Sequence, residues 1–289
     1  VLEEKLPMAL IHEGVGEVVF DNTGSFNVGD NVVMIPNTPT KKDDYISANY
    51  LPSSKFRGSG FDGFTSDLIQ LNPDRLVKLP DNFNLKISSF IELISVICHG
   101  IDRFEKIAIK HKNRFGVWGD GNLGYITALL LKEFYPESEV IVIGKHGENL
   151  NLFSFADKTY KFHEVPDDLA VDHGFECVGS NASQAAIDQI INTINPQGSV
   201  ILFGVSEYPI PINTRLVLEK GLTIQGISRS ERKDFLKVVE ILKNNPKLFD
   251  SLDKLIGEVV TVKSLNDLKE AFDKDYISGF GKTVLVWDK

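Results

Sequence analysis

The sequence predicts an α/β protein in which a doubly wound sheet of six parallel strands is joined to a β-rich domain. Three observations support this. Six short apolar segments alternate with helical segments between residues 115 and 227. A Gly-x-Gly-x-x-Gly turn joins the first of these strands to its helix. Residues 10–36 hold short Val- and Ile-rich runs broken by turn sequences, which is typical of β-strands.

Composition limits the class of protein. The 289 residues include 42% hydrophobic and 25% charged residues, which fits a globular protein of about two domains and excludes disordered or coiled-coil chains. The net charge of −9 argues against a nucleic-acid partner. Two cysteines, Cys98 and Cys177, are too few for a four-thiolate zinc site and suit a reducing, cytoplasmic setting. The apolar stretch 87–101 is too short to span a membrane.

The elements are expected in the following order. After the β-rich residues 10–36, the polar segment 37–62 is predicted to be a long irregular loop of functional interest, and residues 63–79 return to strand-like alternation. We expect strands at 115–118, 140–143, 158–162, 174–178, 199–203, 222–227, 258–262 and 283–287. We expect helices at 87–100, 123–134, 148–156, 182–194 and 233–243. The sequence therefore predicts a catalytic domain from residues 1–95 and 231–289, and a nucleotide-binding domain from 96–230.

The glycine turn is the first candidate binding site. Gly119, Gly121 and Gly124 stand between an apolar strand and an apolar helix that opens with Asn122 and Leu123. In a Rossmann domain the first glycine allows the tight turn, the second lets a pyrophosphate approach the backbone, and the third lets helix and strand pack closely. The helix N-terminus then offers free N–H groups to the phosphates. We expect a dinucleotide site here, although an ordinary strand-to-helix turn has the same spacing.

The end of the second strand bears on which dinucleotide binds. An acidic residue about 20 positions beyond the glycines binds the ribose of NADH and repels a 2′-phosphate. Here position 144 is Gly, and Lys145 and His146 follow it. This pattern favours NADPH over NADH, with a solvated surface lysine as the alternative interpretation.

Three residues form a candidate metal site. Glu92 lies among apolar neighbours, where a carboxylate is costly to bury without a cation. His12 and Glu13 form a second cluster near the start of the chain. Together they offer nitrogen and oxygen ligands that Zn²⁺ accepts. Their spacing alone also allows a buried ion pair and a surface His-Glu pair.

Several segments together resemble the zinc-dependent medium-chain dehydrogenases. Four segments carry most of the resemblance: Leu-Ile-His-Glu-Gly-Val-Gly-Glu-Val-Val (10–19), Asp-Gly-Phe-Thr-Ser-Asp (62–67), Ile-Glu-Leu-Ile-Ser-Val (91–96) and Phe-Glu-Cys-Val-Gly (175–179). Two shorter segments also match: Val-Gly-Asp-Asn-Val-Val (28–33) and Leu-Pro-Asp (79–81). The resemblance covers nearly the whole chain. It implies a GroES-like catalytic domain wrapped around the Rossmann domain, with the active site in the cleft between them.

The resemblance also implies roles for the candidate metal site. His12 matches a zinc ligand, Glu13 a ligand in the polyol dehydrogenase branch, and Glu92 a carboxylate that faces the metal directly or through water. The family's first zinc ligand is a Cys, and the 11 residues before His12 contain none. Either that Cys lies roughly 25 residues upstream of His12, in an N-terminal part that this sequence lacks, or the site is not a zinc site. The family's four-Cys structural lobe is replaced by the loop 36–60, so no structural zinc is expected.

The substrate is suggested by the loop 51–63, which resembles the ribulose-5-phosphate reductases (ribitol-5-phosphate 2-dehydrogenases) of bacterial polyol-phosphate pathways such as teichoic acid synthesis. Lys55 and Arg57 in this loop are candidates to bind a phosphate, and Arg229 matches a substrate-contacting Arg of polyol dehydrogenases. Solvated surface charge is an equal alternative for all three. The resemblance further suggests a homodimer formed through nucleotide-domain edges near residues 202–205, and a cytidylyltransferase that uses the product.

The leading hypothesis is therefore an NADPH-dependent, zinc-assisted reductase of ribulose 5-phosphate, with the proton donor left open. A dehydrogenase of non-phosphorylated polyols or alcohols is the alternative of the same class. A zinc-free module that binds NADPH without turnover is the alternative of a different class.

Overall fold

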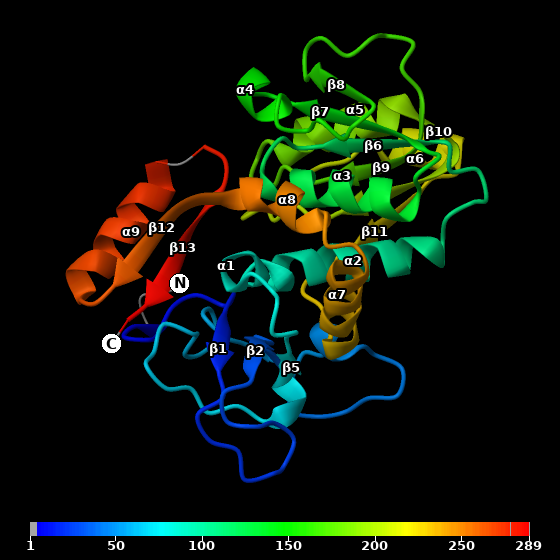
Figure 1. Ribbon diagram of the computed structural model, residues 1–289. Helices are drawn as coiled ribbons and strands as arrows, with labels where there is room; N and C mark the ends of the chain where they lie inside the picture. Colours follow the sequence, from blue (N-terminus) through cyan, green and yellow to red (C-terminus); the bar gives the residue numbers. More distant parts are fainter. Residues whose placement is uncertain (1–4, 278, 289) are drawn as a thin grey trace. The chain divides into compact units, whose positions relative to one another are not determined.

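The structure is a computed structural model that describes residues 5–277 and 279–288 (Figure 1). The chain divides into two compact units. One unit contains the chain up to His99 and from Ser228 onward, and the other runs from Gly100 to Ile227. The expected boundaries after residues 95 and 230 lie within a few residues of these positions. Among the described residues, no helix has both the length and the apolar character needed to cross a membrane.

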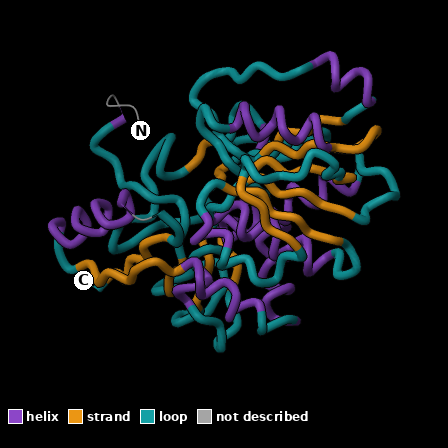
Figure 2. Tube along the Cα trace, turned by 90° about the horizontal axis from the view of Figure 1, so that it is seen from above, coloured by secondary structure: helices purple, strands orange, loops and turns teal. Residues whose placement is uncertain are grey.

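The second unit is built on a six-stranded parallel sheet in the order β11-β10-β9-β6-β7-β8. Its strands are β6 (Arg114–Trp118), β7 (Glu139–Gly144), β8 (Lys158–Lys161), β9 (Val171–Glu176), β10 (Ile194–Leu202) and β11 (Thr223–Gly226). Its helices are α3 (Asn122–Phe134), α4 (Gly147–Leu150), α5 (Ser183–Thr193) and α6 (Thr214–Lys220). Figure 2 shows the strands side by side with helices on either side of them. The chain winds outward from β6 in both directions, so the predicted doubly wound fold is confirmed.

Burial explains why these segments are parallel strands. All six residues of β9 are buried, and five of the six in β7 are buried too. Strands covered by helices on both faces have no solvent-exposed face, so β7 is a nearly continuous apolar run. β9 differs, because its buried Asp172, His173 and Glu176 are polar and have hydrogen-bond partners. The core packs Trp118 and Ile141 from the strands against Ile190 of α5.

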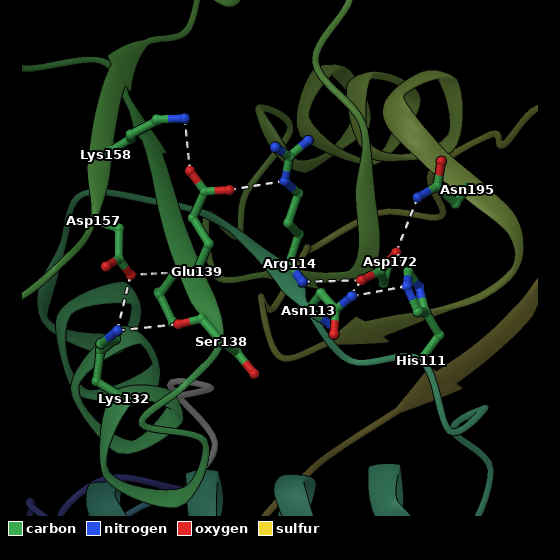
Figure 3. Close-up of polar contacts among 11 residues, drawn as sticks. His111, Asn113, Arg114, Lys132, Ser138, Glu139, Asp157, Lys158, Asp172 and Asn195 are labelled. Carbon is green, nitrogen blue, oxygen red and sulfur yellow. Dashed lines mark hydrogen bonds and ion pairs between the residues drawn. The ribbon is translucent and has the colours of Figure 1, made fainter.

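The amino ends of these strands are held by polar contacts (Figure 3). The carboxylate of Asp172, which is 2% exposed, accepts hydrogen bonds from the backbone N–H groups of Asn113 and Arg114. It also contacts the side chains of His111 and Asn195. Glu139 bridges Arg114 and Lys158, and Asp157 pairs with Lys132. Because parallel strands start at one edge, this cluster lies at the edge opposite the glycine turn and has a structural role.

The first unit is rich in short strands. A three-stranded antiparallel sheet has the order β1-β2-β5, from β1 (Val15–Glu17), β2 (Asn31–Met34) and β5 (Leu76–Lys78). β3 (Asn37–Thr38) pairs with β4 (Lys55–Phe56), and β12 (Ile256–Val262) with β13 (Lys282–Trp287). The unit also holds η2 (Ala48–Tyr50), η3 (Pro73–Arg75), η4 (Asp253–Leu255), α1 (Leu85–Ser88), α7 (Arg232–Asn244), α8 (Leu248–Leu252) and α9 (Leu265–Ile277). Helix α2 (Ile91–Glu105) starts in this unit and ends in the other.

Three predictions of local structure were wrong. The expected strand region 63–79 contains only β5, at its end. The helix expected at 148–156 ends at Leu150, since the following residues turn and Phe153 packs edge-on against Tyr125, 5.1 Å away. The described residues after 230 contain three α-helices instead of one. The missed helix α9 had a signal, because Ser264 and Asp267 form a Ser-x-x-Asp cap at its start.

Candidate active site

The glycine turn has the geometry that a dinucleotide site requires. Gly119 has a φ of 132°, and a Cβ there would lie 2.8 Å from the carbonyl oxygen of Cys177. A Cβ on Gly124 would lie 1.9 Å from the carbonyl oxygen of Gly119, so only glycine lets the helix pack this closely. At Gly121 a Cβ would meet nothing within 4 Å. This side of the turn is open for a pyrophosphate to approach the backbone.

The helix behind the turn begins without a side-chain cap. Asn122 and Leu123 are the first residues of α3, and Gly121 stands at its N-cap position with no side-chain hydrogen bond. The positive end of the helix dipole lies at this turn and favours an anion there.

A carboxylate that we did not foresee stands at the end of β7. Asp120, between the first two glycines of the turn, accepts hydrogen bonds from the backbone N–H groups of Lys145 (2.9 Å) and His146 (2.5 Å). Its Oδ2 also lies 3.1 Å from Nδ1 of His146. A Cβ on Gly144 would come within 2.4 Å of the Asp120 Cβ, so glycine is needed for this approach.

This arrangement is relevant to cofactor choice. The carboxylate of Asp120 already accepts hydrogen bonds from two peptide N–H groups and contacts the imidazole of His146. The side chains of Lys145 and His146 are exposed. The exposed Lys145 ammonium and the exposed His146 imidazole beside a bound carboxylate suit a 2′-phosphate. The sequence prediction sought an acid on β7 itself and therefore missed one supplied by the glycine turn.

Glu176, at the end of β9, organises the same edge of the sheet. Its carboxylate is 1% exposed and accepts hydrogen bonds from the backbone N–H groups of Val178, Gly179 and Gly204. A Cβ on Gly204 would lie 2.5 Å from both carboxylate oxygens. Glu176 thereby fixes the loops that follow β9 and β10, where ligands of doubly wound sheets bind.

The three candidate metal ligands come together in the first unit. One ligand atom from each of His12, Glu13 and Glu92 lies within 4.8 Å of the other two. His12 Nε2 lies 4.0 Å from Glu92 Oε2. Glu92 belongs to the first turn of α2, whereas His12 and Glu13 precede β1.

The backbone before His12 is tightly constrained. Ile11 has a φ of 63°, which is unusual for a β-branched residue. A Cβ on Gly63 would lie 2.1 Å from the carbonyl oxygen of Ile11, and the N–H of Gly63 donates to the carbonyl of Ala9. The Asp-Gly segment that resembled a family landmark therefore packs directly against the segment that bears the histidine.

The electrostatics of this cluster suit a cation. Burial raises the pKa of Glu92 to about 8, the charge of Glu13 adds to the rise, and the Lys282 ammonium opposes it. Burial also lowers the pKa of His12, which favours the neutral, ligating form of the imidazole. Lys282 from β13 forms an ion pair with Glu13.

A neutral imidazole and two carboxyl groups form a nitrogen and oxygen donor set that Zn²⁺ accepts. A divalent cation would also favour the ionised form of the buried Glu92. The residues present therefore fit a zinc ion. Lys282 was not foreseen, because a lone lysine before an apolar strand looks like any surface lysine.

The substrate-binding candidates have different surroundings. Arg229, with a φ of 59°, places its guanidinium 4.7 Å from the ring centroid of Phe56. That ring lies 5.1 Å from the ring of His12, so Arg229 is linked to the metal cluster through Phe56. Lys55, the neighbour of Phe56 on β4, is exposed.

Arg57, in contrast, is engaged in its own loop. Its Nη1 donates to the carbonyl of Asp62 at 2.9 Å, and its guanidinium lies 4.7 Å from the ring centroid of Phe61. Burial lowers its pKa. This side chain holds the loop together, which leaves it less free to bind a phosphate than Arg229 or Lys55.

Comparisons with known proteins show which proteins this chain is similar to. A family model described as zinc-binding dehydrogenase matches residues 153–244. Ribulose-5-phosphate reductase 1 of Staphylococcus aureus (strain NCTC 8325 / PS 47) is 56% identical over 287 residues, which cover 99% of this chain and 84% of that protein. Ribulose-5-phosphate reductase of Bacillus spizizenii is 50% identical with the same coverage.

Solved structures give the same result. The crystal structure of S. aureus TarJ in complex with NADPH superposes with a TM-score of 0.89 at 50% identity, covering 99% of this chain and 83% of that one. L-idonate 5-dehydrogenase from Escherichia coli has a TM-score of 0.84 at 18% identity, which shows the shared fold. On the strength of its full-length relatives, this chain belongs to the ribulose-5-phosphate reductase family of the zinc-binding medium-chain dehydrogenases.

Proposed function

We propose that this protein reduces ribulose 5-phosphate to ribitol 5-phosphate by reversible hydride transfer from NADPH, assisted by a zinc ion. The observation that carries the proposal is the cluster of His12, Glu13 and Glu92 in a chain 56% identical to a named ribulose-5-phosphate reductase. The NADPH present in the related TarJ structure supports the choice of cofactor.

The nucleotide unit binds and orients the cofactor. The open face at Gly121 and the uncapped start of α3 receive the pyrophosphate. Lys145 and His146, held by Asp120, receive the 2′-phosphate that distinguishes NADPH from NADH. Glu176 holds the loops at the carboxyl edge of the sheet in place.

The catalytic unit holds the metal and the substrate. His12, Glu13 and Glu92 bind zinc, and Lys282 holds the carboxylate of Glu13. A bound zinc ion supplies Lewis-acid chemistry suited to polarising a substrate carbonyl. Arg229 and Lys55 bind the phosphate of the sugar, close to His12 through Phe56.

The test is NADPH oxidation by the zinc-loaded protein with a panel of carbonyl compounds: ribulose 5-phosphate, ribulose, xylulose 5-phosphate and simple aldehydes. We expect kcat/KM to be highest for ribulose 5-phosphate and lower with NADH as cofactor. A higher value for unphosphorylated ribulose would support a polyol or alcohol dehydrogenase instead. NADPH binding without oxidation of any kind would support a binding module. Arg229→Ala is expected to raise KM for the phosphorylated sugar selectively.

We also propose that the protein is a cytoplasmic homodimer whose product is consumed by a cytidylyltransferase. The expected dimer contact near residues 202–205 needs revision, because Leu202 pairs with Glu176 of β9 and with Gly226 of β11 and so lies inside the sheet. The edge strand at that end is β11, which is the better candidate for pairing with a second copy.

A further inference from the structure

A buried polar network lies beside the metal cluster and takes no part in the proposed function so far. Its centre is His99 on α2, which is 3% exposed, paired with Asp234 of α7, which is fully buried. His99 Nδ1 lies 3.1 Å from Asp234 Oδ2. On the other side, His99 Nε2 lies 3.2 Å from both the Asn49 side-chain nitrogen and the Tyr50 hydroxyl. Because Asn49 can only donate through this nitrogen, His99 donates from Nδ1 and accepts at Nε2.

Asn49 and Ser95 hold the residues on either side of Arg229. On the N-terminal side, Asn49 Nδ2 donates to the carbonyl of Ser228 at 2.9 Å. On the C-terminal side, the hydroxyl groups of Ser230 and Ser95 lie 2.7 Å apart and are both buried.

The next residue, Glu231, is anchored twice. Its backbone N–H donates to Asp234 Oδ2 at 2.7 Å, and its side chain accepts from the N–H of Ala48 at 3.0 Å. The loop that carries Lys55 and the segment that carries Arg229 are therefore tied together.

Arg229 itself has the backbone conformation that such anchors explain. Its φ of 59° lies in the left-handed region, which an L-residue other than glycine adopts at a cost. A strained residue persists only where its surroundings impose the conformation. Here the carbonyl before it and the hydroxyl after it are both fixed, and the guanidinium is thereby directed onto the Phe56 ring.

A second metal site is the competing interpretation, since His99, Glu231 and Asp234 each offer an atom within 4.8 Å of the others. Most of their polar atoms already have protein partners, although the buried Asp234 Oδ1 has none among the described residues. Glu231 accepts from Ala48 and pairs with Lys233, and Asp234 Oδ2 accepts from both Glu231 and His99. The contacts therefore favour a hydrogen-bonded clamp, by which we mean the network of Asn49, Ser95, His99 and Asp234 around Arg229.

We infer that the network of Asn49, Ser95, His99 and Asp234 positions Arg229 to receive the phosphate of the substrate. This inference rests on the proposed function, because it takes Arg229 as the phosphate ligand. The four residues touch neither cofactor nor substrate in this role, so they are positioning residues that act through Arg229.

The test compares Asn49→Ala, which removes the anchor of the Ser228 carbonyl, with a matched control. Ser88→Ala is that control, because the Ser88 hydroxyl is buried and has no hydrogen-bond partner among the described residues. We expect Asn49→Ala to raise KM for ribulose 5-phosphate by about fivefold, as the loss of a buried hydrogen bond implies. The KM for NADPH and the zinc content should not change. The control should behave like the wild type.

The decisive experiment measures the effect of Asn49→Ala on the KM for ribulose 5-phosphate in a protein that already carries Arg229→Ala. If the clamp acts through Arg229, the added substitution has no further effect on KM. An equal fivefold rise in both backgrounds overturns the inference, and so does a normal KM for Arg229→Ala. A merely structural role would leave the two effects additive.

A second measurement does not depend on turnover. Amide hydrogen exchange of residues 228–231 should become faster in Asn49→Ala and in Ser95→Ala, but not in Ser88→Ala. Unchanged exchange overturns the clamp. If the wild-type protein fails to reduce ribulose 5-phosphate while exchange responds as described, the proposed function has failed and the clamp stands without its substrate role.

Discussion

Replacing Glu92 by Gln is expected to remove a large pH dependence from the stability of the metal-free protein. In the fold the pKa of this carboxyl is about 8, because it is buried and faces Glu13, whereas its ordinary value is 4.5. The neighbouring Lys282 opposes the shift and His12 is kept neutral by burial. The carboxyl therefore stays protonated in the folded state while the unfolded chain has already lost the proton.

The sign of the effect follows from this difference. The contribution to stability is fully present below pH 4.5 and is lost as pH rises through about 8. Each unit of pKa difference is worth about 1.4 kcal/mol, so roughly 3–5 kcal/mol of unfolding free energy should disappear over this range. Urea unfolding of chelator-treated protein between pH 5 and 8 measures this loss of unfolding free energy. Glu92→Gln should show a flatter profile, and Glu17→Gln, at an exposed position, should not.

Zinc binding provides the complementary measurement. At pH 7 most of the Glu92 side chains are protonated, so binding should release about one proton per zinc ion. Calorimetry in two buffers of different ionisation enthalpy detects that proton. The Glu92→Gln variant should bind zinc more weakly and release fewer protons per zinc ion. Identical pH profiles for wild type and Glu92→Gln, or zinc binding with no proton release, would refute the reasoning.

Three further outcomes follow from single contacts. Gly124→Ala should lower both Tm and NADPH affinity, because its Cβ would lie 1.9 Å from the Gly119 carbonyl oxygen. Gly121→Ala should weaken NADPH binding and leave Tm nearly unchanged, because its Cβ would meet nothing within 4 Å. Equal losses of Tm in the two variants would contradict this prediction. Lys282→Met should destabilise the metal-free protein by about 1–3 kcal/mol, because it leaves the partly buried Glu13 carboxylate without its lysine partner. Added zinc should restore part of the loss, and thermal unfolding with and without zinc measures both effects. Burial lowers the pKa of His173 to about 4, so the free energy of unfolding should fall by about 3 kcal/mol as pH falls from 6.5 towards 4. The variant His173→Gln should lack this loss. Urea unfolding at pH 7 and pH 5 that shows the same loss in both proteins would contradict the prediction.

The parallel sheet could be predicted because its signals are local. The buried strand β7 is a nearly continuous apolar run, and the glycine turn marks the first strand-to-helix junction. The start of β9 has a weaker signal, because its Asp172 and His173 are polar although buried. The tail was harder to predict. Helix α9 has a polar sequence, and only its Ser264 cap marks its start. The short α4 ends where aromatic side chains fold back on Tyr125, which depends on tertiary packing.

The site could be predicted only where a residue type is unusual for its surroundings. Glu92 stands out as a carboxylate within an apolar helix, and the structure brings it to His12. Lys282 contacts Glu13 from 269 positions away, and nothing in its local sequence indicates this. Asp120 was missed for a related reason, since its function comes from the absence of a side chain at Gly144.

The fate of a labelled hydride tests the proposed reaction most directly. The zinc-loaded protein would be incubated with ribulose 5-phosphate and NADPH carrying two deuterium atoms at C4 of the nicotinamide, and the product would be analysed by mass spectrometry and NMR. We expect ribitol 5-phosphate with a single deuterium atom at C2, formed in step with NADPH oxidation. NADPH that binds but transfers no deuterium to the sugar phosphate, or deuterium found only in an unphosphorylated polyol, would contradict the account.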